Sequence, residues 1–208
     1  MTYRLAIFDF DGTLADTFPW FIDIFNDVAD RYGFRRIAPS DVEALRGSDG
    51  RAMMRHLGLP RWKVPFIANH MRKLVARDID RIPLFDGTAP LLRRLSDKGV
   101  TLAVVSSNAE ANVRRVLGPE NAALIAHYEC GASIFGKAAK FRKVMARSGI
   151  SASQTIGIGD EIRDIEAARA ANIACGAVLW GFAQPAALKA HAPDEVFASF
   201  DEIAERIG

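Results

Sequence analysis

The sequence predicts an α/β protein with a Rossmann-like core of three layers around a parallel sheet, plus a small α-helical domain inserted after the first strand. Two observations predict this fold. Short apolar runs, typical of strands buried on both faces, alternate with amphipathic helical patterns along most of the chain. Between the first two of these runs lies a long stretch, residues 17–82, that has helical periodicity and no convincing strand.

The predicted strands are apolar runs that end in polar residues. The clearest of them cover residues 4–10, 100–105 and 155–158, and a further strand is expected at 173–179. The segment 127–135 is a weaker candidate for an edge strand. Parallel strands need long crossover connections, so helices are expected between them.

Helical patterns follow the predicted strands of the core, and glycine closes several of them. They cover residues 90–98, 110–117, 141–148, 162–171 and 200–207. Strands that alternate with helices of this length indicate a parallel sheet with helices on its faces.

The inserted region contains four helical stretches, at residues 20–32, 40–46, 51–57 and 64–81. Ser40, with Glu43 three residues later, has the spacing of a capping box at the start of the second stretch.

The chain returns to the core after Pro83 and the turn signal Asp86-Gly87. We therefore expect a catalytic core of residues 1–16 and 83–208 and a helical cap of residues 17–82.

The charge balance excludes a strongly charged partner. The chain of 208 residues has 27 Lys and Arg against 25 Asp and Glu, a formal net charge of +2, and half of its residues are hydrophobic. It contains no block of like charges that could follow a nucleic-acid backbone. We expect no nucleic-acid partner.

The cysteines and the N-terminal segment indicate the cytoplasm. Cys130 and Cys175 are too few for a disulfide framework and lack the spacing of a zinc site. The apolar stretch near the N-terminus is only a few residues long before it meets acidic residues, so neither a signal peptide nor a membrane partner is expected. Nothing in the sequence decides between a monomer and a homodimer.

Acidic residues follow the first predicted strand. Asp9 and Asp11 are two positions apart and would point to the same side if the strand continued through them. Two carboxylates so close favour a divalent cation such as Mg²⁺, which typically takes one or two carboxylates in proteins. Gly12 allows a tight turn there, and Thr13 offers a hydroxyl and a main-chain N–H to a ligand.

A second acidic cluster makes a simple turn a poor explanation for the first one. Asp160, Glu161 and Asp164 follow the predicted strand 155–158, so they too lie at a strand end. We expect Asp160 to complete the metal site. Asp164, one turn into the next helix, would orient the site or brace a neighbouring lysine. Glu161 is expected to support the site beside it.

Three polar residues elsewhere suit a phosphate ligand. The hydroxyl of Ser106, at the end of the strand 100–105, can donate to a phosphate oxygen, and Asn108 can cap the helix that follows. Lys137 precedes another helix and can place a positive charge against phosphate.

These motifs resemble the haloacid dehalogenase-like superfamily, in its phosphatase branch, over the whole chain. Its first motif appears as Asp9-Phe10-Asp11-Gly12-Thr13-Leu14. Ser106 resembles the serine or threonine of its second motif, with Ser107 as the alternative. Lys137 resembles the lysine of its third motif, with Lys140 as the alternative. Its fourth motif appears as Gly159-Asp160 with Asp164.

The resemblance implies a role for each of these residues. Asp9 would be the nucleophile that forms an aspartyl-phosphate, and Asp11 the general acid and base. Mg²⁺ would bind the Asp9 carboxylate, the Asp11 main-chain carbonyl and Asp160. Ser106 and Lys137 would hold the transferring group. The residues expected to contact the substrate are Gly12, Thr13, Ser107, Asn108 and, from the cap, Arg46, whose fork suits a carboxylate or second phosphate.

The expected function is Mg²⁺-dependent hydrolysis of a small phosphorylated metabolite, a phosphoglycolate-like compound or a sugar phosphate. Asp11 favours a phosphatase over a dehalogenase, which needs no leaving-group acid. The helical insertion resembles the cap of phosphoglycolate phosphatase and β-phosphoglucomutase relatives, although Ala138 follows Lys137 where the phosphoglycolate phosphatase pattern usually has proline. A phosphomutase and a non-catalytic binding protein with the same fold are the alternatives.

Overall fold

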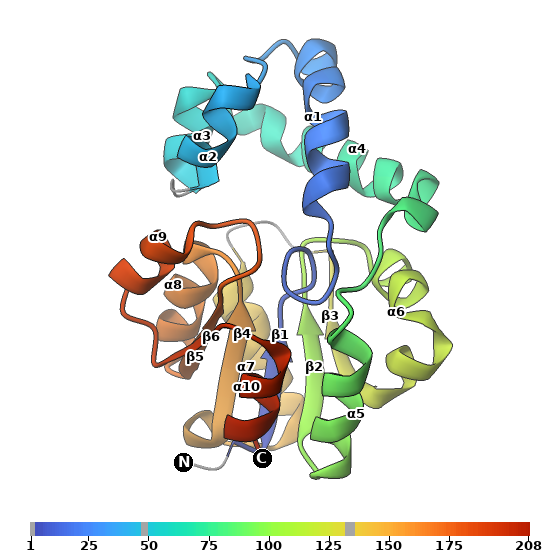
Figure 1. The fold of residues 1–208 in the computed structure, drawn as a ribbon, viewed down its shortest axis with the longest axis vertical. Helices are drawn as coiled ribbons and strands as arrows, with labels where there is room; N and C mark the ends of the chain where they lie inside the picture. The colour runs from blue at the N-terminus through green and yellow to red at the C-terminus, as the bar shows by residue number, and fades with distance from the viewer. Residues whose placement is uncertain (1–2, 47–49, 132–135) are drawn as a thin grey trace.

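The protein is built around one parallel sheet. The computed structural model describes residues 3–46, 50–131 and 136–208, and within them six strands form a sheet in the order β3-β2-β1-β4-β5-β6 (Figure 1). All of the paired strands run parallel. The strands are β1 (Leu5–Phe8), β2 (Thr101–Val105), β3 (Ile125–Glu129), β4 (Thr155–Gly159), β5 (Ala174–Val178) and β6 (Glu195–Phe197). The expected α/β fold with a parallel sheet is confirmed.

Helices cover both faces of this sheet. The helices α5 (Thr88–Asp97), α6 (Glu110–Leu124) and α10 (Phe200–Arg206) pack with one another on one side, whereas α7 (Lys137–Ser148) and α8 (Ile162–Ala171) pack together on the other. The short helix α9 (Pro185–Ala190) places Leu188 in the core beneath α7 and α8. The sheet is therefore the middle of three layers.

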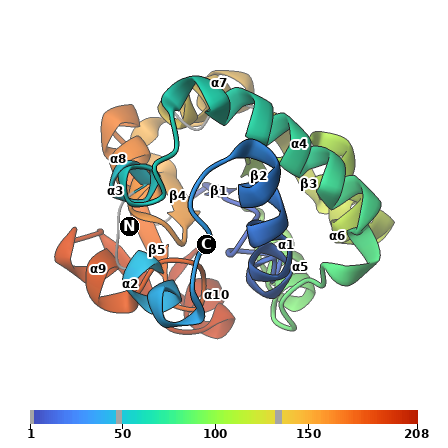
Figure 2. The ribbon, with the colours of Figure 1, turned by 90° about the horizontal axis from the view of Figure 1, so that it is seen from above.

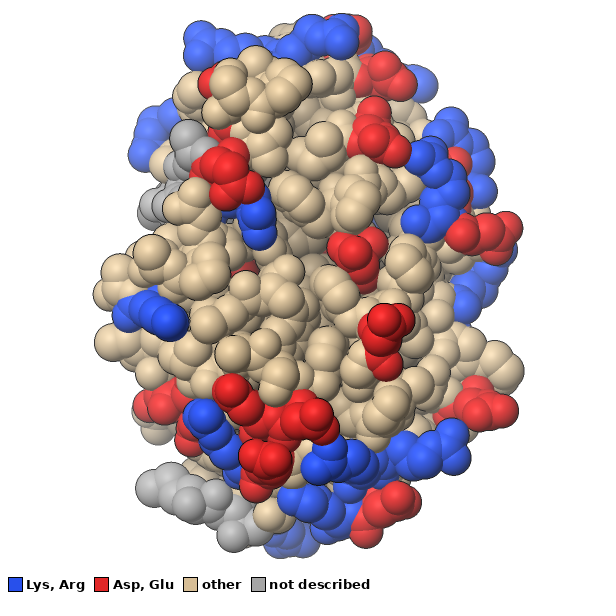
Figure 3. All heavy atoms as spheres, in the orientation of Figure 1, with Lys and Arg blue, Asp and Glu red and all other residues tan. Residues whose placement is uncertain are grey.

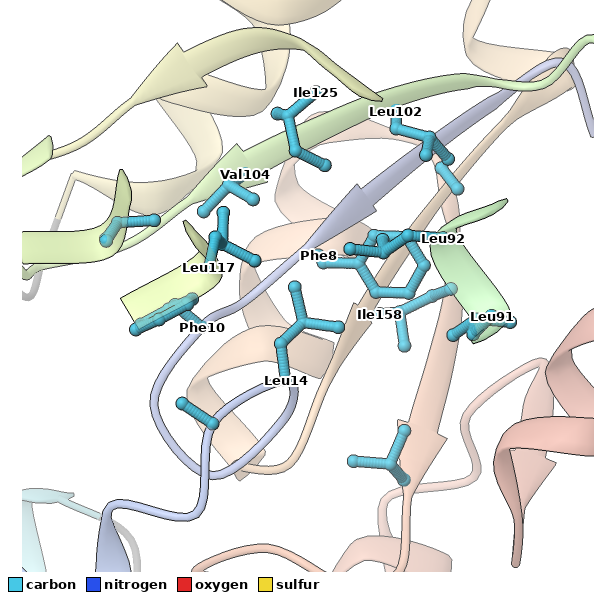
Figure 4. Packing of buried hydrophobic residues seen from close by; sticks show 14 of the residues in the cluster. Phe8, Phe10, Leu14, Leu91, Leu92, Leu102, Val104, Leu117, Ile125 and Ile158 are labelled. Atoms are coloured by element: carbon cyan, nitrogen blue, oxygen red, sulfur yellow. The ribbon is translucent and has the colours of Figure 1, made fainter. Parts of the chain in front are cut away.

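Alternation along the central strand explains the two cores. Ala6 and Phe8 belong to the cluster under α5 and α6, and Leu5 and Ile7 belong to the cluster under α7 and α8. All four residues are completely buried because successive side chains of a strand point to opposite faces. Figure 4 shows the first cluster, in which side chains from several strands and helices meet; those labelled are Phe8, Phe10, Leu14, Leu91, Leu92, Leu102, Val104, Leu117, Ile125 and Ile158.

A helical insertion lies between β1 and β2, over one end of the sheet (Figure 1). Its helices are α1 (Phe18–Tyr32), α2 (Val42–Arg46), α3 (Gly50–His56) and α4 (Val64–Arg77), with 3-10 turns at Pro39–Asp41, Arg61–Lys63 and Ile79–Arg81. Seen from above, the labels of β1, β2 and β4 lie between α4 on one side and α2 and α3 on the other (Figure 2). The insertion has a small apolar cluster of its own, formed by Phe25, Ala29, Ile37, Leu45 and Leu57.

The two segments that join the insertion to the core lie side by side. Ala15 and Leu84 form an antiparallel bridge. The Asp16 N–H donates to the Pro83 carbonyl at 2.9 Å, and the Phe85 N–H donates to the Leu14 carbonyl at 3.1 Å. These main-chain bonds fix the place where the insertion leaves the core and returns to it.

Several predicted boundaries differ from the structure. β1 ends at Phe8 rather than at residue 10, so Asp9 and Asp11 lie in the loop after it. β3 begins at Ile125, and part of the predicted segment 127–135 lies outside the described residues. The capping box expected at Ser40 is wrong, because Ser40 lies inside a 3-10 turn and its hydroxyl donates to Asp41 at 3.2 Å.

Two elements were not predicted, namely β6 and α9. Helix α6 also continues past Leu117, with a break at Gly118 where φ is 73° and ψ is 164°. Among the described residues, the structure contains no helix with the length and apolar character that crossing a membrane requires.

Candidate active site

The candidate site lies where the central strands end. Asp9, Ser106 and Asp160 come directly after β1, β2 and β4, and each is at most 3% exposed. The chain passes from β1 through β2 to β3 on one side and then crosses back to β4 on the other side of β1, so the strand order reverses at β1. Ligands of open parallel sheets bind in the crevice at such a point.

Asp9 is held with one carboxylate oxygen unsatisfied. Its N–H donates to the Ile158 carbonyl of β4 at 2.8 Å, which continues the pairing of β1 and β4. Its Oδ1 accepts the Phe10 N–H at 2.8 Å. Its Oδ2 lies 2.8 Å from the Lys137 ammonium, yet among the described residues it accepts no bond with hydrogen-bond geometry. Burial raises the pKa of Asp9, although the positive charge of Lys137 opposes this.

Lys137 stands between two carboxylates at the start of α7. Its Nζ is 2.6 Å from Oδ1 of Asp164 and 2.8 Å from Oδ2 of Asp9. Burial acts to lower the pKa of Lys137, but the charges of Asp164 and Asp9 outweigh it and the pKa is raised. Lys140, in contrast, donates to the Glu129 carbonyl at 2.6 Å. The structure thus brings Lys137, and not Lys140, to Asp9.

Asp164 is fixed by the start of α8. Its Oδ2 accepts the Glu161 N–H at 3.0 Å, and Glu161 in turn accepts the main-chain N–H of Asp164, so the two residues form a capping box. Burial acts to raise the pKa of Asp164, but Lys137 and Arg163 outweigh it and lower the pKa. Asp164 therefore braces Lys137, as the sequence predicted, while Glu161 pairs with Arg163.

Asp11 is linked to the end of β2. Its Oδ2 is 3.4 Å from the Ser106 hydroxyl, and the Asn108 amide donates to its Oδ1 at 3.3 Å. Burial, together with the charge of Asp9, raises the pKa of Asp11 to about 7. A carboxyl group with this pKa is partly protonated at neutral pH and can give or take a proton.

Asn108 and Ser106 organise the loop after β2. The Asn108 N–H donates to the Ser106 hydroxyl at 3.0 Å, and the side-chain oxygen Oδ1 of Asn108 accepts the N–H of Ala109 at 2.9 Å. α6 begins at Glu110 and Ala109 is its N-cap residue, so Asn108 lies one position before the cap rather than at it, as the sequence had suggested.

Asp160 is completely buried and held by two donors. The Thr13 hydroxyl donates to its Oδ1 at 2.7 Å, and the Phe182 N–H donates to its Oδ2 at 2.7 Å. Burial, followed by the charges of Glu161, Asp164 and Asp9, raises its pKa well above the usual value.

Glycine allows the loop of Asp9 to approach Asp160. Gly12 has a φ of +80°, which favours glycine, and a Cβ there would collide with the Asp160 carboxylate and the Phe182 ring. Its N–H donates to the Ala15 carbonyl at 2.9 Å, which closes the turn. The tight turn expected at Gly12 is present.

The acidic group fits a divalent cation. One carboxylate oxygen from each of Asp9, Asp160 and Asp164 lies within 4.8 Å of the others. Asp164 forms an ion pair with Lys137 at 2.6 Å, whereas Asp160 forms no ion pair among the described residues, so Asp160 is the better donor beside Asp9. Burial and neighbouring carboxylates raise the pKa of both Asp9 and Asp160, as expected where buried acidic groups outnumber basic ones. Carboxylate oxygens are the ligands that Mg²⁺ prefers.

A cavity of about 570 Å³ connects this site with the insertion. Asp11, Ser107, Asn108 and Glu161 line it from the core, and residues of α1, α2 and α4 line it from the insertion. Asp11 therefore opens onto a space that the insertion also lines, while Asp9, Lys137 and Asp160 lie behind it and are not among the lining residues.

A family model described as haloacid dehalogenase-like hydrolase matches residues 6–178. The chain belongs to the haloacid dehalogenase-like hydrolase family. The family expected from the sequence motifs is confirmed, and with it an enzyme of the hydrolase class.

Relatives with two different names and a solved structure of the same fold resemble this chain. The phosphoglycolate phosphatase of Synechococcus elongatus is 32% identical over 192 residues, which cover 92% of this chain and 91% of that protein. The tyrosine-protein kinase PtkA of Mycobacterium tuberculosis is 28% identical over 214 residues, covering 99% of this chain and 72% of that protein. A haloacid dehalogenase-like family hydrolase from Streptococcus pneumoniae matches in fold with a TM-score of 0.80 at 20% identity over 98% of both chains.

Two residues expected to contact substrate in this hydrolase bind other protein groups. Both the hydroxyl and the N–H of Thr13 are used inside the protein, by Asp160 and by the Phe10 carbonyl, so Thr13 orients Asp160 instead. Arg46 donates to the carbonyls of Phe182 and Gly181, each at 2.9 Å, and pairs with Glu43 at 2.9 Å. Arg46 thus ties α2 to the core loop, and its contact with substrate stays a prediction.

Sequence reasoning missed the loop that follows β5 in this hydrolase. The Phe182 N–H reaches Asp160, and the Trp180 indole N–H donates to the Thr13 carbonyl at 3.1 Å. A Cβ at Gly181 would collide with Asp160. The sequence feature that could have indicated this loop is a glycine between two aromatic residues just after a predicted strand. The loop lies at the same edge of the sheet as the acidic loops.

Arg163 was also missed, although it lies within the fourth motif. It lines the cavity and pairs with Glu161, and its Nε is buried with no hydrogen-bond partner in the described part of the chain. Its charge faces the acidic group beside Lys137. A basic residue between Asp160 and Asp164 was the available signal.

Proposed function

We propose that this hydrolase is a Mg²⁺-dependent phosphatase that hydrolyses a small phosphate monoester through an aspartyl-phosphate on Asp9. The supporting observation is the Asp9 carboxylate itself. Its Oδ2 is buried, lies 2.8 Å from Lys137 and, among the described residues, accepts no hydrogen bond. An oxygen held in this way keeps a lone pair that can attack phosphorus.

The first half of the reaction uses Asp9 and Asp11. Oδ2 of Asp9 forms a bond to phosphorus as the bond between phosphorus and the leaving oxygen breaks. Asp11 gives its proton to that oxygen, so the alcohol leaves neutral. The pKa of about 7 leaves part of the Asp11 population protonated at neutral pH, as this step requires.

The second half returns both residues to their starting state. Asp11, now a carboxylate, takes a proton from water while the water oxygen attacks the phosphorus of the aspartyl-phosphate. The bond between phosphorus and Asp9 breaks and inorganic phosphate leaves. The Ser106 hydroxyl is 3.4 Å from Oδ2 of Asp11, which supports a role for it as a donor to a phosphate oxygen.

Lys137 would stabilise the charge on the transferring group. Its ammonium is fixed by Asp164 at 2.6 Å and faces Asp9, where the phosphoryl group would bind. Donors fixed in advance stabilise the charge on the phosphoryl oxygens without reorganising during the reaction.

Asp9, Asp160 and the main-chain carbonyl of Asp11 would hold Mg²⁺, which supplies positive charge against the phosphate oxygens. The local charges support such a cation. Five acidic residues, Asp9, Asp11, Asp160, Glu161 and Asp164, face two basic residues, Lys137 and Arg163. A phosphate dianion would be repelled by this excess of negative charge.

The expected substrates follow from the relatives and the enclosing insertion. The phosphoglycolate phosphatase that is 32% identical supports a small phosphate monoester such as phosphoglycolate or a sugar phosphate. The insertion of residues 17–82 would act as a cap that encloses the substrate and excludes water.

Phosphate release tests the proposal. We expect release from p-nitrophenyl phosphate and from members of a metabolite panel with Mg²⁺, and none with EDTA. Asp9→Asn should abolish turnover with the fold intact by circular dichroism. Asp11→Asn should still be phosphorylated by p-nitrophenyl phosphate, whose leaving group needs no acid, but should release phosphate slowly.

The alternatives give different outcomes. Isomerisation of a sugar phosphate without net phosphate release would show a phosphomutase. A wild-type protein as inactive as Asp9→Asn, with or without Mg²⁺, would show a non-catalytic binding protein. Turnover in a clean Asp9→Asn preparation would refute the covalent route.

A further inference from the structure

The cavity beside Asp11 is larger than a two-carbon leaving group needs. Its volume is about 570 Å³, within the range of about 300–1,000 Å³ typical of pockets that hold drug-sized ligands. The alcohol released from phosphoglycolate is glycolate, which has two carbons. Most of the cavity would stay empty around it.

The wall that the insertion contributes to the cavity is mainly apolar. Phe18 and Phe21 of α1, Val42 of α2, and Val64 and Met71 of α4 line it. These side chains are only partly buried. A ligand that covers partly exposed apolar surface removes it from water, and this favours binding. Methionine adapts its shape to different apolar groups.

Three of the arginines that line the cavity lie at its catalytic end. Arg46 donates to the carbonyls of Gly181 and Phe182, Arg163 pairs with Glu161, and Arg72 lies 3.4 Å from the Ser107 carbonyl. Each of these arginines therefore meets the core loops. A fourth, Arg61, lines the cavity from the insertion. The cavity is thus polar where phosphate would bind and, apart from Arg61, mainly apolar where the rest of the substrate would lie.

Charged side chains are sparse on one face of the molecule. In Figure 3, acidic and basic side chains are interspersed, and the band of surface between the insertion and the core carries few of them.

We infer that the substrate is a phosphate monoester of a hydrophobic alcohol, whose apolar chain or ring fills the cavity between α1, α2 and α4. This inference rests on the proposed phosphatase function and names its substrate class. Phosphate binds at Asp9 and Lys137, and the leaving alcohol extends from Asp11 past Phe18 toward Met71. The apolar wall then selects substrates by the area of carbon surface that they bury.

A homologous series of substrates tests this inference. We would measure kcat/KM for ethyl, butyl and hexyl phosphate and for phosphoglycolate, with p-nitrophenyl phosphate as the general substrate. Burial of one methylene should raise kcat/KM about fourfold. We expect a steady rise along the alkyl series and higher values for hexyl phosphate than for phosphoglycolate.

A matched pair of variants locates the effect. Ala68 of α4 lines the cavity, whereas Ala76 of the same helix is exposed to solvent. Ala68→Phe should flatten the rise with chain length, and Ala76→Phe should behave as the wild type. Should Ala68→Phe fail to fold by circular dichroism, the wild-type series decides alone.

The possible failures are distinguishable. Absence of phosphate release from every substrate, p-nitrophenyl phosphate included, would refute the proposed function. Activity that is flat or falls along the alkyl series, with phosphoglycolate preferred, would overturn the hydrophobic-alcohol inference and leave the phosphatase standing. A full chain-length effect in Ala68→Phe would also overturn it.

Discussion

The Lys137 ammonium lies 2.8 Å from Oδ2 of Asp9 without the geometry of a hydrogen bond. Its hydrogen bond goes to Asp164 at 2.6 Å instead. The lysine therefore pairs with Asp9 mainly through its charge. This arrangement suits an oxygen that must remain a nucleophile beside a cation.

Replacement of Lys137 should remove most of the activity. Lys137→Ala takes away a fixed positive charge at the phosphoryl site, and loss of one such group typically costs about 10²–10³ in kcat. Lys140→Ala is the matched control, because Lys140 binds the Glu129 carbonyl, and it should keep nearly full activity. Steady-state kinetics with p-nitrophenyl phosphate measures both. An equal loss in the two variants would contradict the assignment.

Alanine at Gly12 should weaken metal binding as well as the fold. A left-handed backbone costs a residue with a Cβ about 1–2 kcal/mol, and a Cβ at Gly12 would also displace the Asp160 carboxylate. Gly149→Ala is the control, since Gly149 has a φ of +69° and open space around it. Thermal unfolding should show both variants destabilised, whereas titration calorimetry should show weaker Mg²⁺ binding only for Gly12→Ala. Unchanged Mg²⁺ affinity in Gly12→Ala would be evidence against Asp160 as a ligand.

Loss of Arg46 should loosen the insertion from the core. Arg46→Met removes the bonds to Gly181 and Phe182, so we expect a KM about tenfold higher, since several hydrogen bonds at about 1 kcal/mol each are lost. Hydrogen exchange in residues 180–184 should also become faster. Arg36→Met removes a pair with Asp30 in which both side chains are more than half exposed, and it should change neither quantity. Unchanged exchange in Arg46→Met would show that the contact does not hold the loop.

Asp78 should make stability depend on pH in the acid range. Its pKa is lowered to about 2 by hydrogen bonds from Arg77 and from the Trp20 indole, which is 3.0 Å away. A carboxyl group with a lowered pKa contributes stability above its unfolded pKa of about 3.9, and this is lost as the pH falls toward its folded pKa. Because Arg77 is largely exposed, we expect a contribution of roughly 1 kcal/mol.

Denaturant unfolding of Asp78→Asn and wild type measures this contribution. The difference in unfolding free energy should be largest near pH 6 and should shrink from pH 4 to pH 3. Asp23→Asn removes an exposed partner of Arg81 and serves as the control, with little effect expected. A constant difference across this range would refute the assigned pKa shift.

The fold was predictable because each central strand is a short apolar run buried on both faces. The segments 5–8 and 102–105 are nearly inaccessible to solvent. They contain only apolar residues, so they are easily recognised in the sequence. β6 was missed because Glu195–Phe197 has only three residues, too few for a pattern. The same reason applies to α9, which has six.

The acids of the site were predictable because they follow strands whose ends meet at one edge of the sheet. The support of Asp160 was not, because it comes from the N–H of Phe182, a main-chain group that any residue except proline supplies. The partners of Arg46 are main-chain carbonyls too. Contacts of this kind leave no signature in the residue types.

The central place of β1 has a consequence for the protein as it is made on the ribosome. Leu5 pairs with Thr101 on one side and with Thr155 on the other. At about 5–20 residues per second, roughly 8–30 s of synthesis separate Leu5 from Thr155. The cluster of Phe25, Ala29, Ile37, Leu45 and Leu57 is complete long before then. The nascent chain can therefore pair β1 with β2 on one side while the other side of β1 still lacks its neighbour, and the sheet is completed only after β4 has been made.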